Sequence, residues 1–395
     1  MQRPACSRCS TYGGRVNRVP ALLGAAALAL VAGCGSEAAR TTAAPQAAPS
    51  APACTPAPLP ARAAAVLVVG LPGVTAATDP LAQEVAALGV GGVFLSEPNV
   101  EDAAQVTALV AGFRAASPRP VLVSTDEESG RVAVTREVVG AGPSPRRLAA
   151  ERTPAEVQEF AAGIGARLAA IGVDLDLAPL LDLDDGPSRG IVGDRAFSAD
   201  PALAAEYGLA FSRGLQSAGV TPTVKHFPGQ GRSDEDTHST GGTVDATLDE
   251  LRPTDLAPFQ RAIDAGAPVV MLNHLSYTAL DPDLPATVSP RAYALLREMG
   301  FEGVAMTDSV GMGAINLRWD FPEAAVRAVG AGADAVLATD GAQAVRMRDA
   351  LVAAVESGAL PEERLDEAAA RVTALAGGDP RALSCTDVAL PVLRG

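Results

Sequence analysis

Eight short apolar runs alternate with helical segments along most of the chain, and this alternation limits the fold more than any other feature. The runs cover residues 65–70, 92–95, 120–125, 173–177, 221–226, 268–273, 303–307 and 333–338. Between them lie Ala-, Leu- and Glu-rich segments with helical spacing, such as 102–116, 154–171, 201–218 and 342–357. Eight strand–helix units over about 315 residues predict an α/β fold, a single (β/α)8 TIM barrel. An open doubly wound sheet is the alternative. No GxGxxG motif follows the first run, so nothing supports a dinucleotide cofactor.

The first 62 residues are predicted to lie outside this barrel. Residues 1–33 contain four Arg, no acidic residue and an uncharged apolar stretch, which together are typical of a signal peptide. The small residues Ala32 and Gly33 precede Cys34, as in a bacterial lipobox. We therefore expect an exported protein, lipid-anchored through Cys34 at the outer face of the cytoplasmic membrane; an ordinary signal peptide is the alternative. Residues 34–62, rich in Ala and Pro, predict a flexible tether.

The domain itself is predicted over residues 63–378, with a C-terminal tail at 379–395. Two cysteines remain beyond Cys34, namely Cys54 in the tether and Cys385 in the tail. An exported protein lies in a compartment that permits disulfides, and the two ends of a closed barrel lie near each other. A Cys54–Cys385 bridge and two free thiols therefore both stay open.

Charge and composition argue against nucleic acid as a partner. The formal net charge is -15 at pH 7, whereas phosphate binding needs clustered Lys and Arg. Aromatic residues make up only 4% of the chain, too few for a platform on which single-stranded bases stack. We expect contact with a membrane through the lipid anchor alone.

Polar side chains stand where the predicted strands end, and in a TIM barrel the C-terminal strand ends carry the active site. These residues are Asp126, Lys225, His226, Asn273, His274 and Asp308. The chain has only three His, and the third, His238, falls in a loop of the same predicted face. The sequence therefore predicts one polar site at that end of the barrel.

The most specific stretch reads Lys-His-Phe-Pro-Gly-Gln-Gly at 225–231, followed by Asp-Glu-Asp-Thr-His at 234–238. It resembles the KHFPGHG…DSH signature of glycoside hydrolase family 3, in its β-N-acetylhexosaminidase branch. Further similar elements are Gly-Leu-Pro-Gly at 70–73, Asp-Glu-Glu-Ser-Gly-Arg-Val at 126–132, Gly-Asp-Arg-Ala-Phe at 193–197 and Met-Thr-Asp-Ser at 306–309. The resemblance covers roughly residues 64–375. It implies removal of terminal β-linked N-acetylglucosamine (GlcNAc), with peptidoglycan fragments as the expected substrate and neither metal nor other cofactor.

Retaining cleavage of a glycoside needs a carboxylate on one side of the anomeric carbon and a proton donor on the other. Asp308 at a strand end is the expected nucleophile; capping of the next helix is its structural alternative. The resemblance implies that His238 is the acid/base and that Asp236 orients it. A histidine suits this role because it titrates near neutral pH. A plain surface Asp-Thr-His tripeptide is the alternative.

The remaining site residues are expected to bind the sugar. The resemblance assigns this role to Asp126, Arg195, Lys225 and His226. Their structural alternative is an ion pair of Lys225 and Arg195 with Asp126 or Asp182 at the barrel rim. For His274, lining the pocket and a structural place at the rim are both open.

The sequence departs from the family pattern at several positions. Gln230 replaces the second His of KHFPGHG, Ser129 replaces a Gly, and Ala196 replaces a Ser. The Arg expected eight residues after Asp126 is Val134, while Arg136 comes two residues later. Two explanations are open: Arg136 supplies this sugar contact through a shifted loop, or the site prefers a different sugar substituent.

Other functions compete with this interpretation. A histidine acid/base leaves room for anionic phosphate as acceptor, so a β-N-acetylglucosaminide phosphorylase stays open, as does a β-glucosidase. A metal-dependent, amidohydrolase-like enzyme lacks its usual HxH after the first strand, where Leu-Pro-Gly stands at 71–73. A catalytically dead, sugar-binding lipoprotein is the non-enzyme alternative, and intact Asp308 and His238 argue against it.

Overall fold

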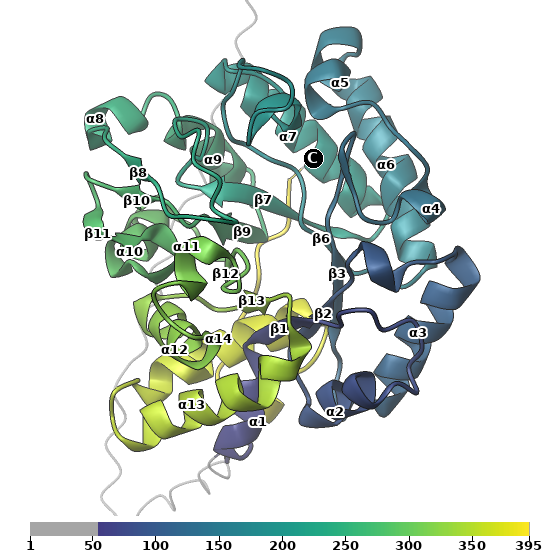
Figure 1. The fold of residues 1–395 in the computed structure, drawn as a ribbon, viewed down its shortest axis with the longest axis vertical. Coiled ribbons are helices and arrows are strands. Elements are labelled where there is room, and N and C mark those ends of the chain that lie inside the picture. Colours follow the sequence, from purple (N-terminus) through teal and green to yellow (C-terminus); the bar gives the residue numbers. More distant parts are fainter. Residues whose placement is uncertain (1–53, 395) are drawn as a thin grey trace, which may run out of the picture. The chain divides into compact units, whose positions relative to one another are not determined.

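Eight parallel strands form the centre of the fold (Figure 1). They are β1 (Leu67–Gly70), β2 (Gly92–Phe94), β3 (Leu122–Thr125), β6 (Leu175–Asp176), β7 (Thr221–Phe227), β9 (Val269–Leu272), β12 (Val304–Thr307) and β13 (Val336–Ala338). The computed structural model describes residues 54–394. Neighbours pair in parallel in the order β12-β9-β7-β6-β3-β2-β1-β13, and a bridge between Met306 and Ala335 joins the two edges. The predicted barrel is confirmed: seven strands lie within one predicted run each, and β7 extends one residue beyond its run, to Phe227.

Helices surround this sheet on its outer side (Figure 1). They include α2 (Pro80–Leu88), α3 (Ala103–Ala116), α6 (Pro154–Ala170), α7 (Pro201–Ser217), α9 (Leu256–Asp264), α10 (Pro290–Glu298), α12 (Phe321–Ala331), α13 (Ala344–Glu356) and α14 (Glu362–Leu375). Several begin with a polar cap followed by proline, which fits the first turn of a helix. Before α6, Thr153 and Glu156 form a capping box, and before α7 the Asp200 side chain accepts from two backbone amides.

Shorter elements fill the loops. The helices are α4 (Arg136–Val139), α5 (Pro145–Glu151), α8 (Leu248–Leu251) and α11 (Gly313–Asn316). The strands are β4 (Glu127–Ser129), β5 (Val132–Ala133), β8 (Thr243–Val244), β10 (Ser276–Tyr277) and β11 (Asp281–Pro285). Most of them extend the loops that follow β3, β7, β9 and β12, so they belong to the same face as the C-terminal strand ends.

Alternation along the strands separates two apolar layers. Val68, Leu175, Met271 and Met306 belong to one cluster, inside the barrel, whereas their strand neighbours pack against the helices in a second, larger cluster. Successive side chains of a strand point to opposite faces of the sheet, so each strand contributes to both layers. The interior layer makes the barrel a solid core, and its upper side chains become the floor of the site described below.

The ordered domain begins earlier than the sequence predicted. Helix α1 (Leu59–Ala65) precedes β1 in the chain. Its buried Arg62 pairs with two residues of α14, Glu362 at 2.7 Å and Asp366 at 2.5 Å. The predicted tether 34–62 was therefore wrong for 54–62, because two long-range ion pairs hold this segment. Residues 34–53, the predicted signal peptide and Cys34 lie outside the described residues.

The C-terminal segment is also part of the fold. After α15 (Pro380–Ser384) the chain runs back to the barrel, where the Arg394 amide donates to Ala265 O at 2.8 Å and Leu393 exchanges hydrogen bonds with Gln216. The side chain of Leu390 packs against the interior cluster. The prediction of a separate tail after residue 378 was wrong, since apolar and backbone contacts fix the segment to the barrel.

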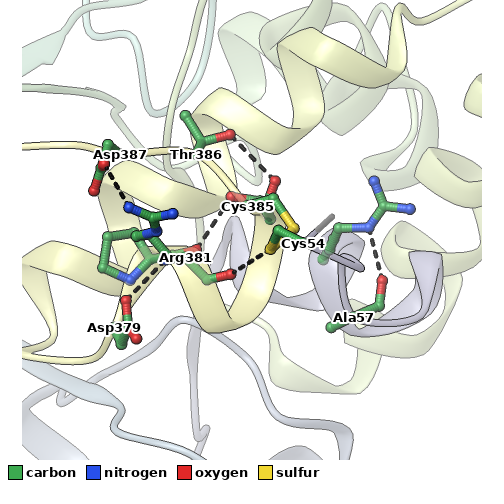
Figure 2. The surroundings of a disulfide bond; sticks show 10 residues. Cys54, Ala57, Asp379, Arg381, Cys385, Thr386 and Asp387 are labelled. Atoms are coloured by element: carbon green, nitrogen blue, oxygen red, sulfur yellow. Dashed lines mark hydrogen bonds and ion pairs between the residues drawn. A yellow bond between two sulfur atoms is a disulfide. The ribbon is translucent and has the colours of Figure 1, made fainter. Parts of the chain in front are cut away.

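A disulfide joins Cys54 to Cys385, with the two Cα atoms 5.8 Å apart (Figure 2). Close by, the amide of Ala57 donates to Leu383 O at 2.8 Å, so covalent and hydrogen bonds connect the two ends of the described chain. The sequence left a disulfide and two free thiols open for these cysteines, and the structure contains the disulfide. None of the helices in residues 54–394 is both long and apolar enough to cross a membrane.

Candidate active site

A cavity of about 590 Å³ opens at the C-terminal ends of the barrel strands. Seven of the predicted site residues line it, namely Asp126, Arg195, Lys225, His226, Asp236, His238 and Asp308. Side chains of the interior cluster, among them Phe94, Met271 and Leu337, also contribute to the wall. Its volume is in the range of pockets that hold small molecules. The barrel thus brings together residues that lie up to 182 positions apart in the sequence.

Asp308 follows β12 directly, and its amide donates to Leu272 O of β9 at 3.0 Å. Its Oδ1 accepts from the Ser309 amide at 2.7 Å. Burial by itself would raise the pKa of Asp308, but nearby His274, His226 and Lys225, together with this amide, bring the pKa below its usual value. The carboxylate is therefore ionised at neutral pH, as a nucleophile must be.

His274 contacts the residue that follows Asp308 and is not among the residues that line the cavity. Its Nε2 is 2.8 Å from Ser309 O and its Nδ1 is 2.6 Å from Thr287 Oγ1. Burial lowers the pKa of His274, so the ring is neutral at pH 7 and donates to Ser309 O. The two alternatives for His274 were lining the pocket and a structural place at the rim. Its contacts with Thr287 and Ser309 O fit the second.

A buried ion-pair network lies on the other side of the cavity. Lys225 Nζ is 2.6 Å from Asp126 Oδ1 and 2.6 Å from Glu128 Oε1. Arg195 binds Glu128 with both ends of its guanidinium, each at 2.7 Å. Burial by itself would raise the pKa of Glu128, but Arg195 and Lys225 hold it well below the usual range. Lys225 and Arg195 therefore line the cavity in fixed positions, and acidic partners largely neutralise their charges.

Glu128 and Asp182 have roles that the sequence did not show. Asp182 pairs with neither Lys225 nor Arg195, contrary to one predicted alternative. Its Oδ2 lies 2.6 Å from His226 Nδ1, and its Oδ1 accepts from the Gln230 amide at 2.7 Å. Asp182 thus fixes the ring of His226 and leaves His226 Nε2 for a ligand. The sequence did offer one signal for Glu128, because this residue belongs to the family-like motif at 126–132.

Asp236 and His238 stand in the loop after β7. Asp236 Oδ1 accepts from the His238 backbone amide at 3.0 Å and lies 2.8 Å from His238 Nδ1. The hydrogen bond from the His238 ring lowers the pKa of Asp236. Since Nδ1 faces the carboxylate, Nε2 is the ring nitrogen left for the cavity, and it has no hydrogen-bond partner among the residues that the structure describes.

Comparison with known proteins identifies the family. Residues 64–375 match the family described as "Glycosyl hydrolase family 3 N terminal domain". The chain belongs to glycosyl hydrolase family 3. "Beta-hexosaminidase LpqI" of Mycobacterium tuberculosis is 36% identical over 302 residues, which cover 74% of this chain and 76% of that protein. The predicted family and its enzyme class, a glycoside hydrolase, are confirmed.

Two solved structures of the same family resemble the fold. A glycosyl hydrolase of family 3 from Mycobacterium smegmatis has a TM-score of 0.76 and 38% identity, over 81% of this chain and 97% of its own. A family 3 beta-N-acetylglucosaminidase from Paenibacillus has a TM-score of 0.78 and 34% identity, over 86% of this chain and 65% of its own. The similarity therefore extends over the whole barrel.

The arginine missing from the family pattern at Val134 is not replaced by Arg136. The Arg136 side chain donates to Gly130 O at 3.1 Å and is not among the residues that line the cavity. Two other arginines line it, Arg131 and Arg189. Sequence reasoning missed both, although Arg131 stands in one of the motifs.

These two arginines differ in their partners. Arg131 pairs with Asp194 at 3.0 Å and donates to three carbonyl oxygens of residues 190–192, so it holds the loop that carries Arg189. Arg189 is exposed, and within residues 54–394 it has no acidic partner. It is thus a cation at the cavity whose charge no described carboxylate neutralises.

The three histidines do not converge on one point. His226 faces Asp182, His238 faces Asp236, and His274 is held between Thr287 and Ser309 O. In the described part of the chain, no group of three or more His, Cys, Asp or Glu is arranged to hold a metal ion. Residues 54–394 therefore offer the amidohydrolase-like alternative no ligand set.

Proposed function

We propose that this glycoside hydrolase is a retaining exo-β-N-acetylglucosaminidase, that is, a β-N-acetylhexosaminidase. One observation carries the proposal: the ionised carboxylate of Asp308 and the Asp236–His238 dyad line the same cavity, on separate loops of the barrel. Two relatives support this choice of sugar, because they are named a beta-hexosaminidase and a beta-N-acetylglucosaminidase.

In the first step Asp308 attacks the anomeric carbon of the sugar. A bond forms between its carboxylate oxygen and that carbon, while the bond to the aglycone oxygen breaks and His238 Nε2 gives its proton to the leaving oxygen. Asp236 stabilises the charged ring and fixes the tautomer through His238 Nδ1. The lowered pKa of Asp308 favours this step, since the nucleophile is ionised before the sugar binds.

In the second step water replaces the enzyme at the anomeric carbon. His238, now neutral, takes a proton from the water, and the ester bond to Asp308 breaks. Two displacements at one carbon retain its configuration. His238 is again protonated at the end, so the cycle is complete.

The ion-pair network is proposed to bind the terminal sugar. Asp126 uses Oδ1 for Lys225 and keeps a second carboxylate oxygen for a sugar hydroxyl. His226 presents Nε2, because Asp182 occupies its Nδ1. Lys225 and Arg195 donate further charged hydrogen bonds, which are shorter and stronger than neutral ones. The rigid network means that little side-chain entropy is lost when the sugar binds.

Peptidoglycan fragments are the proposed natural substrate. Arg189 supports this proposal, because an unneutralised guanidinium suits an aglycone that carries a carboxylate, as muramic acid and wall peptides do. The disulfide supports export, since such bonds persist outside the cytoplasm. We accordingly propose a signal peptide at 1–33, lipidation of Cys34, a tether that ends before Cys54, and a domain over the described residues.

Covalent trapping tests the catalytic assignment. Incubation with an activated 5-fluoro derivative of GlcNAc, which keeps the acetamido group, should add one sugar mass to the protein, and peptide mass spectrometry should locate it on Asp308. A label on another residue, or none, would refute the proposed nucleophile. Product analysis with GlcNAc-MurNAc fragments, with and without phosphate, tests the rest. Free GlcNAc in both mixtures is expected, whereas a sugar phosphate would indicate a phosphorylase.

A further inference from the structure

The acid/base dyad stands on a turn that is built almost entirely from its own hydrogen bonds. We define the acid/base turn as residues 236–240. The Asp236 side chain binds His238 twice, and Asp236 O accepts from the amides of Ser239 at 2.9 Å and Thr240 at 3.0 Å. The side chains of Asp236 and His238 are 45% and 73% exposed. The turn therefore sets the geometry within the dyad, but the exposed side chains of Asp236 and His238 do not fix where the turn lies.

Two backbone hydrogen bonds connect the acid/base turn to the segment that follows the nucleophile. The Gly313 amide donates to His238 O at 2.9 Å, and the Ala314 amide donates to Thr237 O at 3.1 Å. Within residues 54–394, these are the hydrogen bonds that join the turn to a distant part of the chain. Thr237 is only 2% exposed, so the turn packs against the rest of the protein at this contact.

The segment from Asp308 to Gly313 is itself anchored on the barrel. The Asp308 amide donates to Leu272 O at 3.0 Å, and the Val310 amide donates to Leu337 O at 2.9 Å. Gly313 comes five residues after Asp308. A single short stretch of backbone thus carries the nucleophile at one end and the contact to the acid/base turn at the other.

Only a glycine allows so close an approach at this contact. A Cβ atom at position 313 would lie 2.6 Å from Ser239 O and 2.8 Å from His238 O. Both are backbone atoms, so rotation of a side chain cannot relieve the overlap. The need for glycine arises from space, since the backbone of Gly313 is not in the left-handed region.

We propose that Gly313 is a positioning residue for the acid/base: through the two backbone hydrogen bonds it sets the place of His238 relative to Asp308. This inference rests on the proposed function, because it requires His238 to be the proton donor.

A pair of glycine variants tests this proposal. Gly313→Ala forces the turn away from α11, whereas Gly241→Ala places a methyl group in open space just beyond the turn. We compare kcat/KM, which reports the first displacement, on an alkyl β-GlcNAc glycoside and on a dinitrophenyl one. General acid catalysis contributes about 10²- to 10⁴-fold, and it matters for the alkyl leaving group. Gly313→Ala should lose at least about tenfold on the alkyl glycoside and less than about threefold on the other. Gly241→Ala should match the wild type on both.

The same substitution in a His238→Ala background separates positioning from general damage. If Gly313 acts through His238, Gly313→Ala should cause no further loss there, because the donor is already absent. Equal losses on both glycosides, full additivity with His238→Ala, or wild-type behaviour of Gly313→Ala would each overturn the proposal.

Two further measurements keep the outcome decisive. If Gly313→Ala is poorly folded, hydrogen exchange of the wild-type protein decides, since the amides of Gly313 and Ala314 should be protected. Exchange of both at the rate of an unstructured peptide would overturn the docked turn. A wild-type enzyme inactive on every β-GlcNAc glycoside would refute the proposed function and this inference together, whereas failure of the variants alone refutes only the inference.

Discussion

Replacing both Cys54 and Cys385 by serine should lower the free energy of unfolding of the domain by several kcal/mol. The disulfide joins residues 331 positions apart, so nearly the whole described chain lies inside the loop that it closes. Cross-linking stabilises a protein mainly by restricting its unfolded chain, and the effect grows with the logarithm of loop length. This bridge is therefore close to the largest effect that a chain of this size allows.

The loop length gives the magnitude. For a closed loop of 331 residues, the chain-entropy relation gives about 5.8 kcal/mol at 25 °C. Residual structure in the unfolded chain reduces the entropy that the cross-link removes, so we expect a measured loss of about 3 to 6 kcal/mol. Domains are commonly stable by only about 5 to 15 kcal/mol, so the loss is a large part of the total.

Urea denaturation measures this loss directly. The chain has one tryptophan, Trp319, which is buried and lies far from both cysteines in sequence, so its fluorescence reports unfolding of the barrel. The wild type in reducing buffer is the matched control, and its transition should coincide with that of the double serine variant. Hydrolysis in native buffer should be unchanged, because neither cysteine lines the cavity.

A loss below about 1 kcal/mol would refute the reasoning about the unfolded chain. It would mean that the two ends separate without release of the barrel, so that the bridge closes only a local contact. A changed midpoint for the double variant, without the same change in the reduced wild type, would point instead to damage by the serines.

Four other outcomes are expected. Asp308→Asn should lose at least about 10³-fold in kcat/KM while circular dichroism shows an intact fold, and retained activity would contradict its role. His238→Ala should lose more on alkyl than on dinitrophenyl glycosides, and equal losses would count against a proton donor. Arg189→Ala should weaken kcat/KM about three- to tenfold for aglycones with a carboxylate and leave neutral aglycones unchanged; the same loss on both would show that charge is not recognised. Because the pKa of Glu128 is lowered in the fold, its ion pairs stabilise the protein above the ordinary carboxyl pKa and lose this effect as pH falls toward the lowered value. Glu128→Gln should thus cost about 3 to 5 kcal/mol in urea denaturation at pH 7 and clearly less at pH 3, and a difference independent of pH would contradict the network.

Much of the fold was predictable because it depends on local pattern. The eight apolar runs matched the eight strands, since period and turn residues determine a strand from its own sequence. The rule that strand ends form the active face then placed Lys225, His226 and Asp308 at one site before any coordinates. Short motifs such as 225–231 and 306–309 supplied the family in the same way.

The ends of the domain were not predictable, because amino-acid composition was the only signal that the sequence offered there. Residues 54–62 read as a tether, yet Arg62 finds two acidic partners on α14, about 300 positions later in the chain. The segment after residue 378 has no strong period, but its Leu390 side chain reaches the barrel interior. Long-range contacts of this kind have no signature within a sequence window.

The sequence by itself determined the barrel, the face that carries the chemistry and the residue types available there. Only the tertiary structure decided the partners: Glu128 for Arg195, Asp182 for His226, and Gly313 for the turn that carries His238. The physical reason is that strand formation depends on neighbours along the chain. Tertiary neighbours that folding brings within about 3 Å decide the rest. They determine how a charged side chain is oriented, how far the pKa of a carboxylate shifts and whether a Cβ atom has space.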